Sequence, residues 1–580
     1  MRKTECRYFP SSDGTELFYR YWPPQTGKPG GAIVLFHRGH EHSGRLQHLA
    51  DELDLPNFAI FAWDARGHGL SFNEQDRSEP TLGTFTKDVD CFIRHISSEY
   101  GIAMEQIAVA GQSVGAVLLA AWAHDYAPKI RCMSLAAPAF EVKLYVPLAR
   151  PALSAASKMF GEFQVNSYVR PSALTHDPER IASYRIDPLI RRPISVKVLL
   201  ALYSTADRVI ADAQAIRVPT QMLVAGDDWV VRRRPQLDFF ARLGSPVKEI
   251  HEFHGFLHDL LGEKDRHLPI SQLRAFLLRM FEAPPAQESL IEADRSGYTK
   301  REYDALRQPL PWTSRRGLMY RAFRRGLRRI SRLSGGLRLG FATGFDSGST
   351  LDYVYRNQPS GVTPLGRSID WFYLNSAGWR GIRVRGHNVG RLLREGAARL
   401  RNAGRPVRVL DVAAGYGRYV LSALQDAEVE QILLRDYSQE NVRRGRALIR
   451  EKGLEDVARF EQGDAFDEKQ LAETKPRPTL AVVSGLYELF PENAGPRQSL
   501  AGLAAAIEPG GYLVYTGQPW HPQLEMIART LPSHRGMQPW VMRRRTQGEL
   551  DQLVEAAGFE KVDQLADDAG IFTVSIAQRR

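Results

Sequence analysis

The sequence predicts two consecutive α/β units, each a largely parallel β-sheet covered by helices. Three observations lead to this prediction. The chain has 580 residues, which is too long for one ordinary core but suits two sheets of up to ~250 residues each. Short, strongly apolar runs alternate with amphipathic helical stretches, as expected of buried parallel strands. With 43% hydrophobic and 25% charged residues, the composition is that of a globular protein.

The cysteine content and the N-terminus bear on the compartment. The only cysteines are Cys6, Cys91 and Cys132, which excludes a disulfide scaffold and suits a reducing compartment. The N-terminus has no apolar signal-peptide core, and no uncharged apolar run reaches the ~18 residues of a membrane span. We therefore expect a cytoplasmic protein.

The first unit is predicted over residues 1–282. Its strand at 107–111 leads into Gly111-Gln112-Ser113-Val114-Gly115, followed by a helical pattern. A G-x-S-x-G sequence between strand and helix presents the serine hydroxyl at the top of the sheet, because the sharp turn leaves no room for extra Cβ atoms. The alternative is a glycine-rich turn without chemistry. The apolar runs of this unit are 31–36, 58–63, 107–111, 130–137 and 220–226.

Two further segments accompany this turn, HRGHEHSGR at 37–45 and DARGHGLS at 64–71. With them, the first half resembles the monoacylglycerol lipase/serine aminopeptidase group of α/β-hydrolases, which implies an α/β-hydrolase fold with a cap. The chain departs from the family at Arg38 and His40, where the family usually has glycine. Gly39 is retained, so its backbone N–H and that of Val114 are the expected oxyanion hole.

The resemblance also assigns an acid and a base. Asp228 is favoured over Asp227 because the family's acid precedes a short hydrophobic pair. His258 matches the family's H-[DE]-L-L-x-E pattern. We expect Ser113 to attack a carbonyl, His258 to take its proton, and Asp228 to fix the imidazole tautomer. The other candidate bases are His251, inside a predicted strand, and His254.

An insertion at about 140–215 occupies the place of the cap in this fold. Apolar residues and basic residues are mixed throughout it. Such a lid could receive an acyl chain beside an anionic headgroup, and a plain helical cover is equally compatible.

The second unit is predicted over residues 346–580. A strand at 407–415 runs into Gly415-Tyr416-Gly417, a turn that lets the backbone approach a ligand at the head of the sheet. The third glycine of a dinucleotide fingerprint would be at Val420, which disfavours NAD(P). The next strand ends in Asp436, where adenosine-binding sheets hold the ribose hydroxyls.

Further motifs follow in order: Gly463-Asp464-Ala465-Phe466, then PTLAVVSGLYELF, then IEPGGYLVYTGQPWH. This succession resembles class I S-adenosylmethionine-dependent methyltransferases, with their Rossmann-like fold. The resemblance implies S-adenosylmethionine as cofactor and no metal. It places the methionine part at Gly415 and Gly417, the ribose at Asp436, the adenine at Asp464 and Ala465, and the first-strand acid at Asp411.

The segment 347–386 is rich in aromatic residues and resembles the region preceding the core in a bacterial methyltransferase family often fused behind such a hydrolase. Its aromatic side chains either close over the cofactor and shape the acceptor pocket or pack as an ordinary helical cover; they are Tyr353, Tyr355, Tyr373 and Trp379. At predicted strand ends, the acceptor-site candidates are Tyr487, Glu488, Trp520 and His521. Of these, Glu488 or His521 could remove a proton.

A linker is predicted over 283–345, with a basic amphipathic helix at 315–338. That stretch has nine Arg and no acid, so it accounts for most of the formal charge of +11. Such a helix is typical of an element on an anionic membrane surface. The alternative is packing of its apolar arc on the second unit. No nucleic-acid partner is expected, because no stacking platform or DNA-binding motif accompanies the arginines. The apolar arc comprises Met319, Tyr320, Phe323, Leu327, Ile330 and Leu333.

Together these observations predict a bifunctional enzyme, with a serine hydrolase of monoacylglycerol or lysophospholipid type and a methyltransferase of open acceptor. Peripheral association with the inner face of the membrane is part of this hypothesis. Two alternatives remain: a hydrolase half that only binds acyl ligands for the methyltransferase, and a non-lipid esterase or peptidase.

Overall fold

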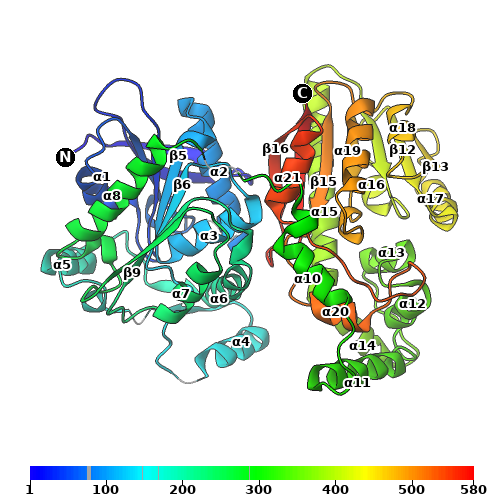
Figure 1. The fold of residues 1–580 in the computed structure, drawn as a ribbon, viewed down its shortest axis with the longest axis horizontal. Helices are drawn as coiled ribbons and strands as arrows, with labels where there is room; N and C mark the ends of the chain where they lie inside the picture. Colours follow the sequence, from blue (N-terminus) through cyan, green and yellow to red (C-terminus); the bar gives the residue numbers. More distant parts are fainter. Residues whose placement is uncertain (75–79, 147, 168, 286–287) are drawn as a thin grey trace. The chain divides into compact units, whose positions relative to one another are not determined.

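A computed structural model describes residues 1–74, 80–146, 148–167, 169–285 and 288–580. The chain divides into two compact units, Met1–Glu288 and Ser289–Arg580 (Figure 1). Residues 286–287, within the predicted linker, lie outside the described ranges.

The first unit is built on an eight-stranded sheet in the order β1-β2-β4-β3-β5-β6-β9-β10. Its strands from β4 onward are parallel, because helices form the connections. The strands are β1 (Glu5–Pro10), β2 (Glu16–Trp22), β3 (Ala32–Phe36), β4 (Ala59–Trp63), β5 (Ile107–Gln112), β6 (Cys132–Ala136), β9 (Thr220–Ala225) and β10 (Lys248–Phe253).

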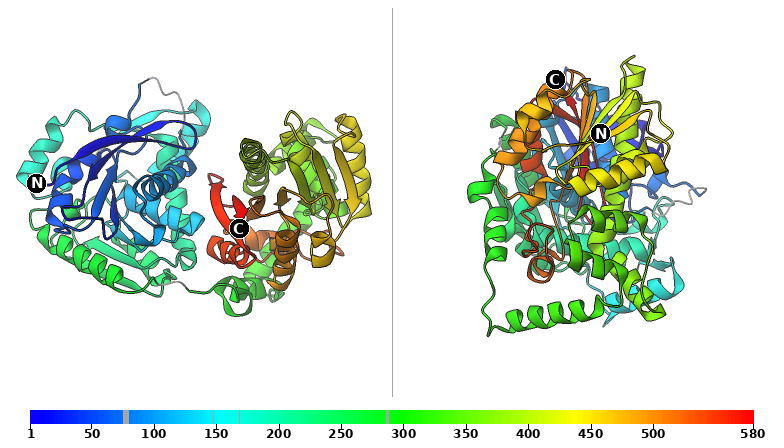
Figure 2. Two further views of the ribbon diagram at one scale, coloured as in Figure 1. Left: turned by 90° about the horizontal axis from the view of Figure 1, so that it is seen from above. Right: turned by 90° about the vertical axis from the view of Figure 1, so that its right-hand side faces the viewer.

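Helices cover both faces of this sheet (Figures 1 and 2). Apolar side chains of α1 (Gln47–Glu52) and α8 (His267–Glu282) share one core with β3, β4 and β5. On the other face, α2 (Leu82–Tyr100) packs against α3 (Val114–Tyr126). Strand β5 and helix α3 meet at residue 113, which fixes the predicted Ser113 turn at the carboxyl edge of the sheet.

Between β6 and β9 the chain forms the insertion predicted as a cap. Helix α6 packs against α3 and α7, so the C-terminal part of the insertion belongs to the body of the unit. The elements are α4 (Ala149–Phe160), β7 (Gln164–Asn166), α5 (Pro178–Ile186), β8 (Pro193–Ser195) and α6 (Val196–Ala211), with α7 (Arg233–Arg242) following β9.

The second unit contains a seven-stranded sheet in the order β13-β12-β11-β14-β15-β17-β16, in which only β17 runs antiparallel to its neighbours. The order reverses between β11 and β14, which opens a crevice at the carboxyl ends of these strands. The strands are β11 (Arg408–Val412), β12 (Gln431–Asp436), β13 (Ala458–Gln462), β14 (Leu480–Val483), β15 (Tyr512–Gly517), β16 (Phe559–Ala566) and β17 (Thr573–Arg579).

Helices also cover both faces of this sheet. Helix α15 (Ala377–Asn402), α16 (Arg418–Ala423) and α17 (Gln439–Glu451) contribute to one apolar core, and α19 (Ala494–Ala506) and α21 (Gln547–Ala556) to the other. The remaining short helices of this sheet region are α18 (Glu468–Ala472) and α20 (Leu524–Thr530).

Residues 289–345, for which the sequence predicts a linker, form helices within the second unit. The predicted basic helix is divided, because Ser334 begins a new helix by accepting a hydrogen bond from the backbone N–H of Leu337. These helices are α9 (Ala293–Ser296), α10 (Tyr298–Arg307), α11 (Arg315–Ile330) and α12 (Gly335–Thr343), followed by α13 (Gly348–Arg356) and α14 (Pro364–Leu374).

Candidate functional sites

The turn after β5 holds Ser113 in a strained conformation, with φ 56° and ψ −114°. Glycine is required on both sides of it. A Cβ atom at Gly111 would lie 2.8 Å from the backbone carbon of Gly115, and one at Gly115 would lie 2.6 Å from the carbonyl oxygen of His37. The turn is therefore a nucleophile elbow, and the strain serves to aim the Ser113 hydroxyl out of the sheet.

Three of the predicted side chains form a continuous hydrogen-bonded relay. The Ser113 Oγ lies 2.8 Å from Nε2 of His258, and Nδ1 of the same ring lies 2.7 Å from Oδ2 of Asp228. Since a carboxylate only accepts, Nδ1 carries the proton and Nε2 is free to accept one from the Ser113 hydroxyl. All three side chains are buried.

Asp228 is itself held in place by the backbone. Its Oδ1 accepts hydrogen bonds from the N–H groups of Val230 at 2.7 Å and Val231 at 2.9 Å. Burial by itself would raise the pKa of the Asp228 carboxyl, but His258 and these two N–H groups hold the pKa below its usual value. The carboxylate is thus charged and oriented at neutral pH.

The alternative residues do not join the relay. Asp227 is exposed, and His254 is exposed in the turn after β10. His251 lies in β10, and its ring contacts Glu249 at 3.1 Å. Gly39 lies directly beside the elbow, since a Cβ atom there would be 3.3 Å from Cγ2 of Val114. The structure therefore brings the two predicted oxyanion-hole segments together.

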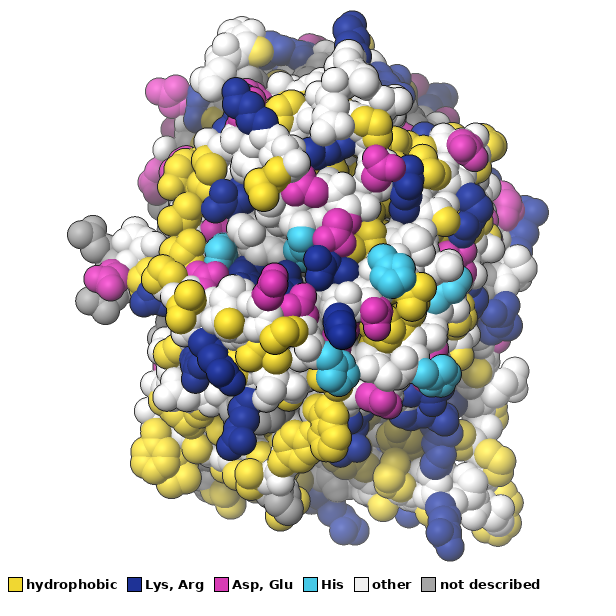
Figure 3. Space-filling view, turned by 90° about the vertical axis from the view of Figure 1, so that its left-hand side faces the viewer, with side chains coloured by type: hydrophobic (Ala, Val, Ile, Leu, Met, Phe, Trp, Pro, Cys, Tyr) yellow, Lys and Arg dark blue, Asp and Glu magenta, His cyan; other side chains and the backbone are white. Residues whose placement is uncertain are grey.

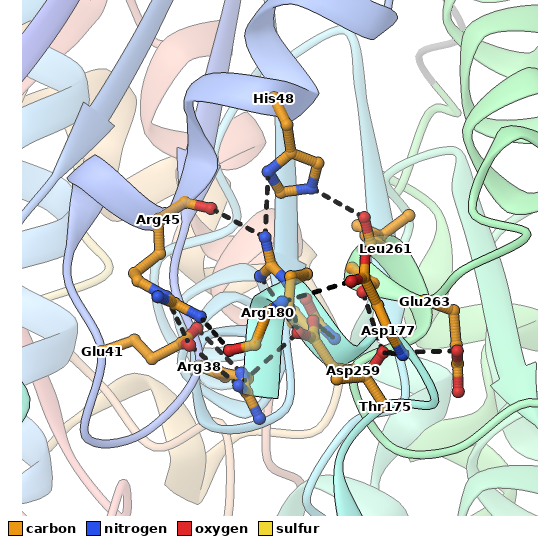
Figure 4. Close-up of polar contacts among 12 residues, drawn as sticks. Arg38, Glu41, Arg45, His48, Thr175, Asp177, Arg180, Asp259, Leu261 and Glu263 are labelled. Carbon is orange, nitrogen blue, oxygen red and sulfur yellow. Dashed lines mark hydrogen bonds and ion pairs between the residues drawn. The ribbon is translucent and has the colours of Figure 1, made fainter. Parts of the chain in front are cut away.

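Arg38, where the resemblance leads us to expect glycine, is buried in an ion network (Figure 4). Its Nε and Nη2 each donate to the carboxylate of Glu41 at 2.8 Å, and its guanidinium lies 3.5 Å from Asp259. Arg180 of α5 donates to the same Asp259 at 3.0 Å. Burial would raise the pKa of Asp259, but Arg180 and Arg38 hold it well below its usual value.

This network also contacts the loops that carry Ser113 and His258. Nε2 of Gln112, the residue before Ser113, donates to Oδ1 of Asp259 and to the carbonyl oxygen of His258, both at 3.1 Å. Asp259 therefore links four segments in one cluster: the loop of Arg38 after β3, helix α5 of the cap, the Ser113 turn and its own loop beside His258. Sequence reasoning treated Arg38 only as a departure from the family and missed this role.

A cavity of about 490 Å³ lies beside Asp228, between the cap and the loop after β9. Its walls are mainly apolar, with two basic side chains, and Leu257 next to His258 forms part of them. The lining residues are Tyr145, Val169, Arg170, Ser172, Ala173, His176, Trp229, Val230 and Leu257. On the face of the hydrolase-like unit in Figure 3, basic and acidic side chains are interspersed among apolar ones.

In the second unit, a cleft of about 1160 Å³ lies at the carboxyl ends of β11, β12 and β14. Of the six residues predicted to bind a cofactor, Gly415, Gly417, Asp436, Asp464 and Ala465 line this cleft. Asp411 lies behind it, fully buried, with Oδ1 accepting from the Tyr419 hydroxyl at 2.8 Å and Oδ2 without a partner among the described residues.

The cleft fits an adenosyl and amino-acid ligand. Gly415 has φ +60°, and only the Cα of Gly348 comes within 4.0 Å of a Cβ built there, so a side chain would extend into the cleft. Gly417, at φ +74°, begins α16, whose N-terminus faces the same space. Burial raises the pKa of Asp436, and its Oδ2 accepts from the Gly415 N–H at 2.9 Å, which ties the acid to the glycine turn.

A second, smaller cavity of about 250 Å³ lies next to this cleft. Two of the acceptor candidates, Glu488 and His521, line it. The other two do not: Tyr487 is buried in the core and donates to Ser499, while Trp520 lies under the guanidinium of Arg544.

The aromatic residues of 347–386 are also divided between locations. Tyr355 lines the large cleft, and Tyr373 and Trp379 line the apolar cavity. Tyr353 instead donates a hydrogen bond to Asp370. Sequence reasoning missed Arg385, which lines both spaces and lies 3.4 Å from Glu488.

Burial lowers the pKa of His521 to about 4, so its ring is neutral at pH 7. The backbone N–H of Gln523 donates to its Nδ1 at 3.1 Å. The ring proton therefore lies on Nε2, and His521 presents a hydrogen-bond donor, not a base, toward the cavity. Glu488 is the remaining candidate for proton removal.

Comparison with known proteins identifies both halves. Residues 273–579, more than half of the chain, match the family described as "Putative methyltransferase". The chain belongs to this family. Residues 27–265 match the family described as "Serine aminopeptidase, S33". The two units are therefore an α/β-hydrolase unit and a methyltransferase-family unit, which confirms both resemblances and the predicted fold class.

Individual relatives show how far each likeness extends. "Uncharacterized protein YnbC" of Escherichia coli (strain K12) is 53% identical over 575 residues, covering 99% of this chain and 98% of its own. "Monoacylglycerol lipase" of Mycolicibacterium smegmatis is 24% identical over 279 residues, covering 47% of this chain and 95% of its own. The crystal structure of Paleococcus ferrophilus monoacylglycerol lipase covers 46% of this chain and 99% of its own, with 23% identity and a TM-score of 0.41.

Other classes of site are absent from the residues that the structure describes. These residues contain no group of three or more His, Cys, Asp or Glu side chains that could hold a metal ion. They also contain no helix with the length and apolarity needed to cross a membrane.

Proposed function

We propose that the chain is a bifunctional enzyme. Its hydrolase unit cleaves an acyl ester with Ser113 as nucleophile, and its second unit transfers a methyl group from S-adenosylmethionine. The observation that carries the first half is the relay from Ser113 through His258 to Asp228, with distances of 2.8 and 2.7 Å. We place it in the cytoplasm, because three cysteines in 580 residues suit a reducing compartment.

In the hydrolase unit, His258 Nε2 accepts the hydroxyl proton as Ser113 Oγ attacks the ester carbonyl. Asp228 holds the ring and stabilises the imidazolium that forms. The backbone N–H groups of Gly39 and Val114 donate to the developing oxyanion. His258 then returns its proton to the leaving alcohol, and water releases the acyl group by the same relay.

The proposed substrate class is a monoacylglycerol or a lysophospholipid. Two observations support it: the mainly apolar walls of the 490 Å³ cavity beside Asp228, and its basic side chains Arg170 and His176. An apolar wall suits an acyl chain, and basic groups suit a phosphate-bearing headgroup. The named function of the Mycolicibacterium smegmatis relative points to the same class.

Steady-state hydrolysis across a chain-length series tests this proposal. Wild type and Ser113→Ala are compared on monoacylglycerols, lysophospholipids and p-nitrophenyl esters from acetyl to palmitoyl. We expect long acyl esters to be preferred and the variant to lose at least about 10³-fold in kcat. A preference for acetyl esters would replace the lipid class with a general esterase. Hydrolysis at the uncatalysed rate in both proteins would make the hydrolase half a binding module.

In the second unit, bound S-adenosylmethionine supplies an electrophilic methyl group. The chain's own groups, all of which line the cleft, would orient it: Asp436 would accept from the ribose hydroxyls, Asp464 and Ala465 would hold the adenine, and the Gly415–Gly417 turn would hold the amino-acid part. Positioning of this kind is the main contribution of such an enzyme to transfer.

Calorimetric titration with S-adenosylmethionine tests the cofactor. Gly415→Arg fills the cleft, and Gly404→Arg is the matched control. Both glycines have positive φ, +60° and +66°. A Cβ atom at Gly404 meets nothing within 4 Å, however, and Gly404 is not among the residues that line the cleft. We expect binding in wild type and Gly404→Arg and none in Gly415→Arg. Absence of binding in wild type would remove the cofactor assignment.

A further inference from the structure

The apolar cavity and the large cleft of the second unit share a wall. The residues that line both spaces are Asp346, Leu351, Arg385, Gly485 and Leu489. Arg385 and Glu488 form an ion pair at 3.4 Å at this wall, and a Cβ atom on Gly485 would lie 2.8 Å from Nη2 of Arg385. The charged side chains of the cavity, Asp346, Arg385 and Glu488, therefore lie at the end nearest the cleft.

The rest of the cavity is lined by aromatic and aliphatic side chains. Apart from Asp346, Arg385 and Glu488 at the cleft end, its polar side chains are few: Ser376, Gln518, Gln523 and the neutral His521. At about 250 Å³ it is slightly smaller than the ~300–1,000 Å³ of typical small-molecule pockets. It suits a ring or part of an aliphatic chain. Its apolar lining includes Phe323, Leu327, Leu337, Phe345, Tyr373, Trp379, Ile382, Met526, Ile527, Leu531, Trp540, Met542 and Phe572.

The cavity reaches the surface beneath α11 and α14. Phe323 of α11 lines it and is also 45% exposed. Tyr373 of α14 lines it as well, and the preceding residues Trp371 and Phe372 are exposed. Figure 1 shows α11 and α14 near the bottom of the second unit. The N–H of Val362, just before α14, donates to the carbonyl of Leu333, just after α11, at 3.2 Å.

The surface formed by these helices combines apolar and basic side chains, and we call it the α11–α14 face. Among the described residues, no carboxylate forms an ion pair with four of its exposed arginines, Arg315, Arg325, Arg329 and Arg332. Exposed apolar groups beside unpaired arginines are typical of a helix lying in the interface of an anionic bilayer. The exposed apolar residues are Trp312, Leu318, Met319, Phe323, Ile330, Val362, Leu365, Trp371 and Phe372.

We propose that the methyl acceptor is a membrane amphiphile, drawn from an anionic bilayer on which the α11–α14 face lies. Its apolar part fills the cavity, and its nucleophilic head lies at Arg385 and Glu488 beside the cleft. This rests on the proposed methyltransferase activity. In the transfer, the acceptor's lone pair forms the new bond to the methyl carbon, and the pair of the broken sulfur–carbon bond stays on sulfur. A proton from a hydroxyl or amine acceptor passes to Glu488.

Vesicle sedimentation tests the surface. The full chain is mixed with vesicles of phosphatidylcholine alone or with phosphatidylglycerol. Arg325→Glu/Arg329→Glu reverses two charges on α11, and Arg450→Glu/Lys469→Glu makes the same change on exposed residues of α17 and α18. At ~1 kcal/mol per arginine, the α11 variant should bind anionic vesicles at least about 30-fold more weakly, and the control should match wild type. Equal binding of all three proteins, or preference for neutral vesicles, would overturn the proposal.

Transfer of labelled methyl tests the acceptor. Labelled S-adenosylmethionine is supplied with a total bacterial lipid extract and, separately, with the water-soluble extract. Ile382→Trp fills the cavity, and Ile186→Trp, at an exposed residue of α5, is the matched control. We expect label in the lipid fraction, lost in Ile382→Trp and kept in the control, while both variants bind S-adenosylmethionine like wild type.

The outcomes separate the two proposals. Label only in water-soluble molecules, or lipid label that survives Ile382→Trp, would refute the amphiphile while leaving the methyltransferase in place. A wild type that does not bind S-adenosylmethionine would refute the methyltransferase activity, and the amphiphile would fall with it.

Discussion

Replacing Asp228 by asparagine isolates the group that fixes the tautomer of His258. Asp228 Oδ1 accepts from the N–H groups of Val230 and Val231 at 2.7 and 2.9 Å. In Asp228→Asn the amide oxygen keeps these two bonds, because only an oxygen can accept them. The amide NH₂ is then directed at Nδ1 of His258, which in turn must act as acceptor.

The proton therefore moves to Nε2, the atom 2.8 Å from the Ser113 hydroxyl. Nε2 can no longer accept the serine proton, although the geometry is unchanged. The loss expected for a wrong tautomer in such a triad is about 10⁴-fold in kcat, which equals about 5.5 kcal/mol of transition-state stabilisation. KM should change little, because Asp228 does not line the 490 Å³ cavity proposed to take the substrate.

The assay is steady-state hydrolysis of the preferred long-chain ester from pH 6 to 9. Asp227→Asn is the control: this neighbour is exposed and contributes no group to the relay, so the variant should keep most of the wild-type kcat. An Asp228→Asn variant within about 10-fold of wild type, or an equal loss in Asp227→Asn, would refute the tautomer argument.

Three further predictions concern stability. Arg38→Ala leaves the buried Glu41 carboxylate short of a partner and should lower the free energy of unfolding of the hydrolase unit by about 3 kcal/mol. The double variant Arg38→Ala/Glu41→Ala should regain part of this lost stability. Calorimetry measures the free energy of unfolding of both variants. Gly115→Ala places its Cβ 2.6 Å from the His37 carbonyl oxygen and should cost about 1–3 kcal/mol, seen as a lower thermal midpoint. Burial raises the pKa of Asp411 well above its usual value, so the folded chain keeps a proton that the unfolded chain releases above about pH 4. The wild type therefore loses stability as the pH rises from about 4. Asp411→Asn should therefore be more stable than wild type, and the difference in free energy of unfolding should grow with pH. A difference that does not change with pH would contradict the protonation of Asp411 as its cause.

Short local motifs in the sequence marked the two turns that carry the candidate sites. The nucleophile elbow needs glycine at 111 and 115 for steric reasons that any sequence with this turn must satisfy. The Gly415–Gly417 turn needs glycine for a different reason, because both residues have positive φ, +60° and +74°. Assigning Ser113, Asp228 and His258 to one relay required the family pattern, because Ser113 lies over a hundred residues before the other two and Asp228 lies 30 residues before His258.

The role of Arg38 could not be predicted from the sequence. Its partner Glu41 is only three residues away, but Asp259 and Arg180 come from the histidine loop and the cap. Pairing between such distant segments leaves no local pattern. The sequence showed only that an arginine replaced a glycine.

The basic helix illustrates a different limit. Helical periodicity predicted one apolar arc on 315–338, but it does not say whether that arc is covered. In the structure Tyr320 and Leu327 are partly buried, whereas Met319, Phe323 and Ile330 of the same arc stay exposed. Packing on the second unit therefore accounts for part of the arc, and contact with a membrane surface stays a prediction for the exposed part. Tertiary packing decides between them residue by residue.

Covalent labelling tests directly whether Ser113 is the nucleophile of the hydrolase unit. The full chain is treated with a fluorophosphonate and digested, and the modified peptide is identified by mass spectrometry, beside Ser113→Ala and His258→Ala. The relay of Ser113, His258 and Asp228 predicts a single adduct on Ser113 in wild type, none in Ser113→Ala and strongly slowed labelling in His258→Ala. An adduct on another serine, or ester turnover in a chain whose Ser113 is never labelled, would contradict the account.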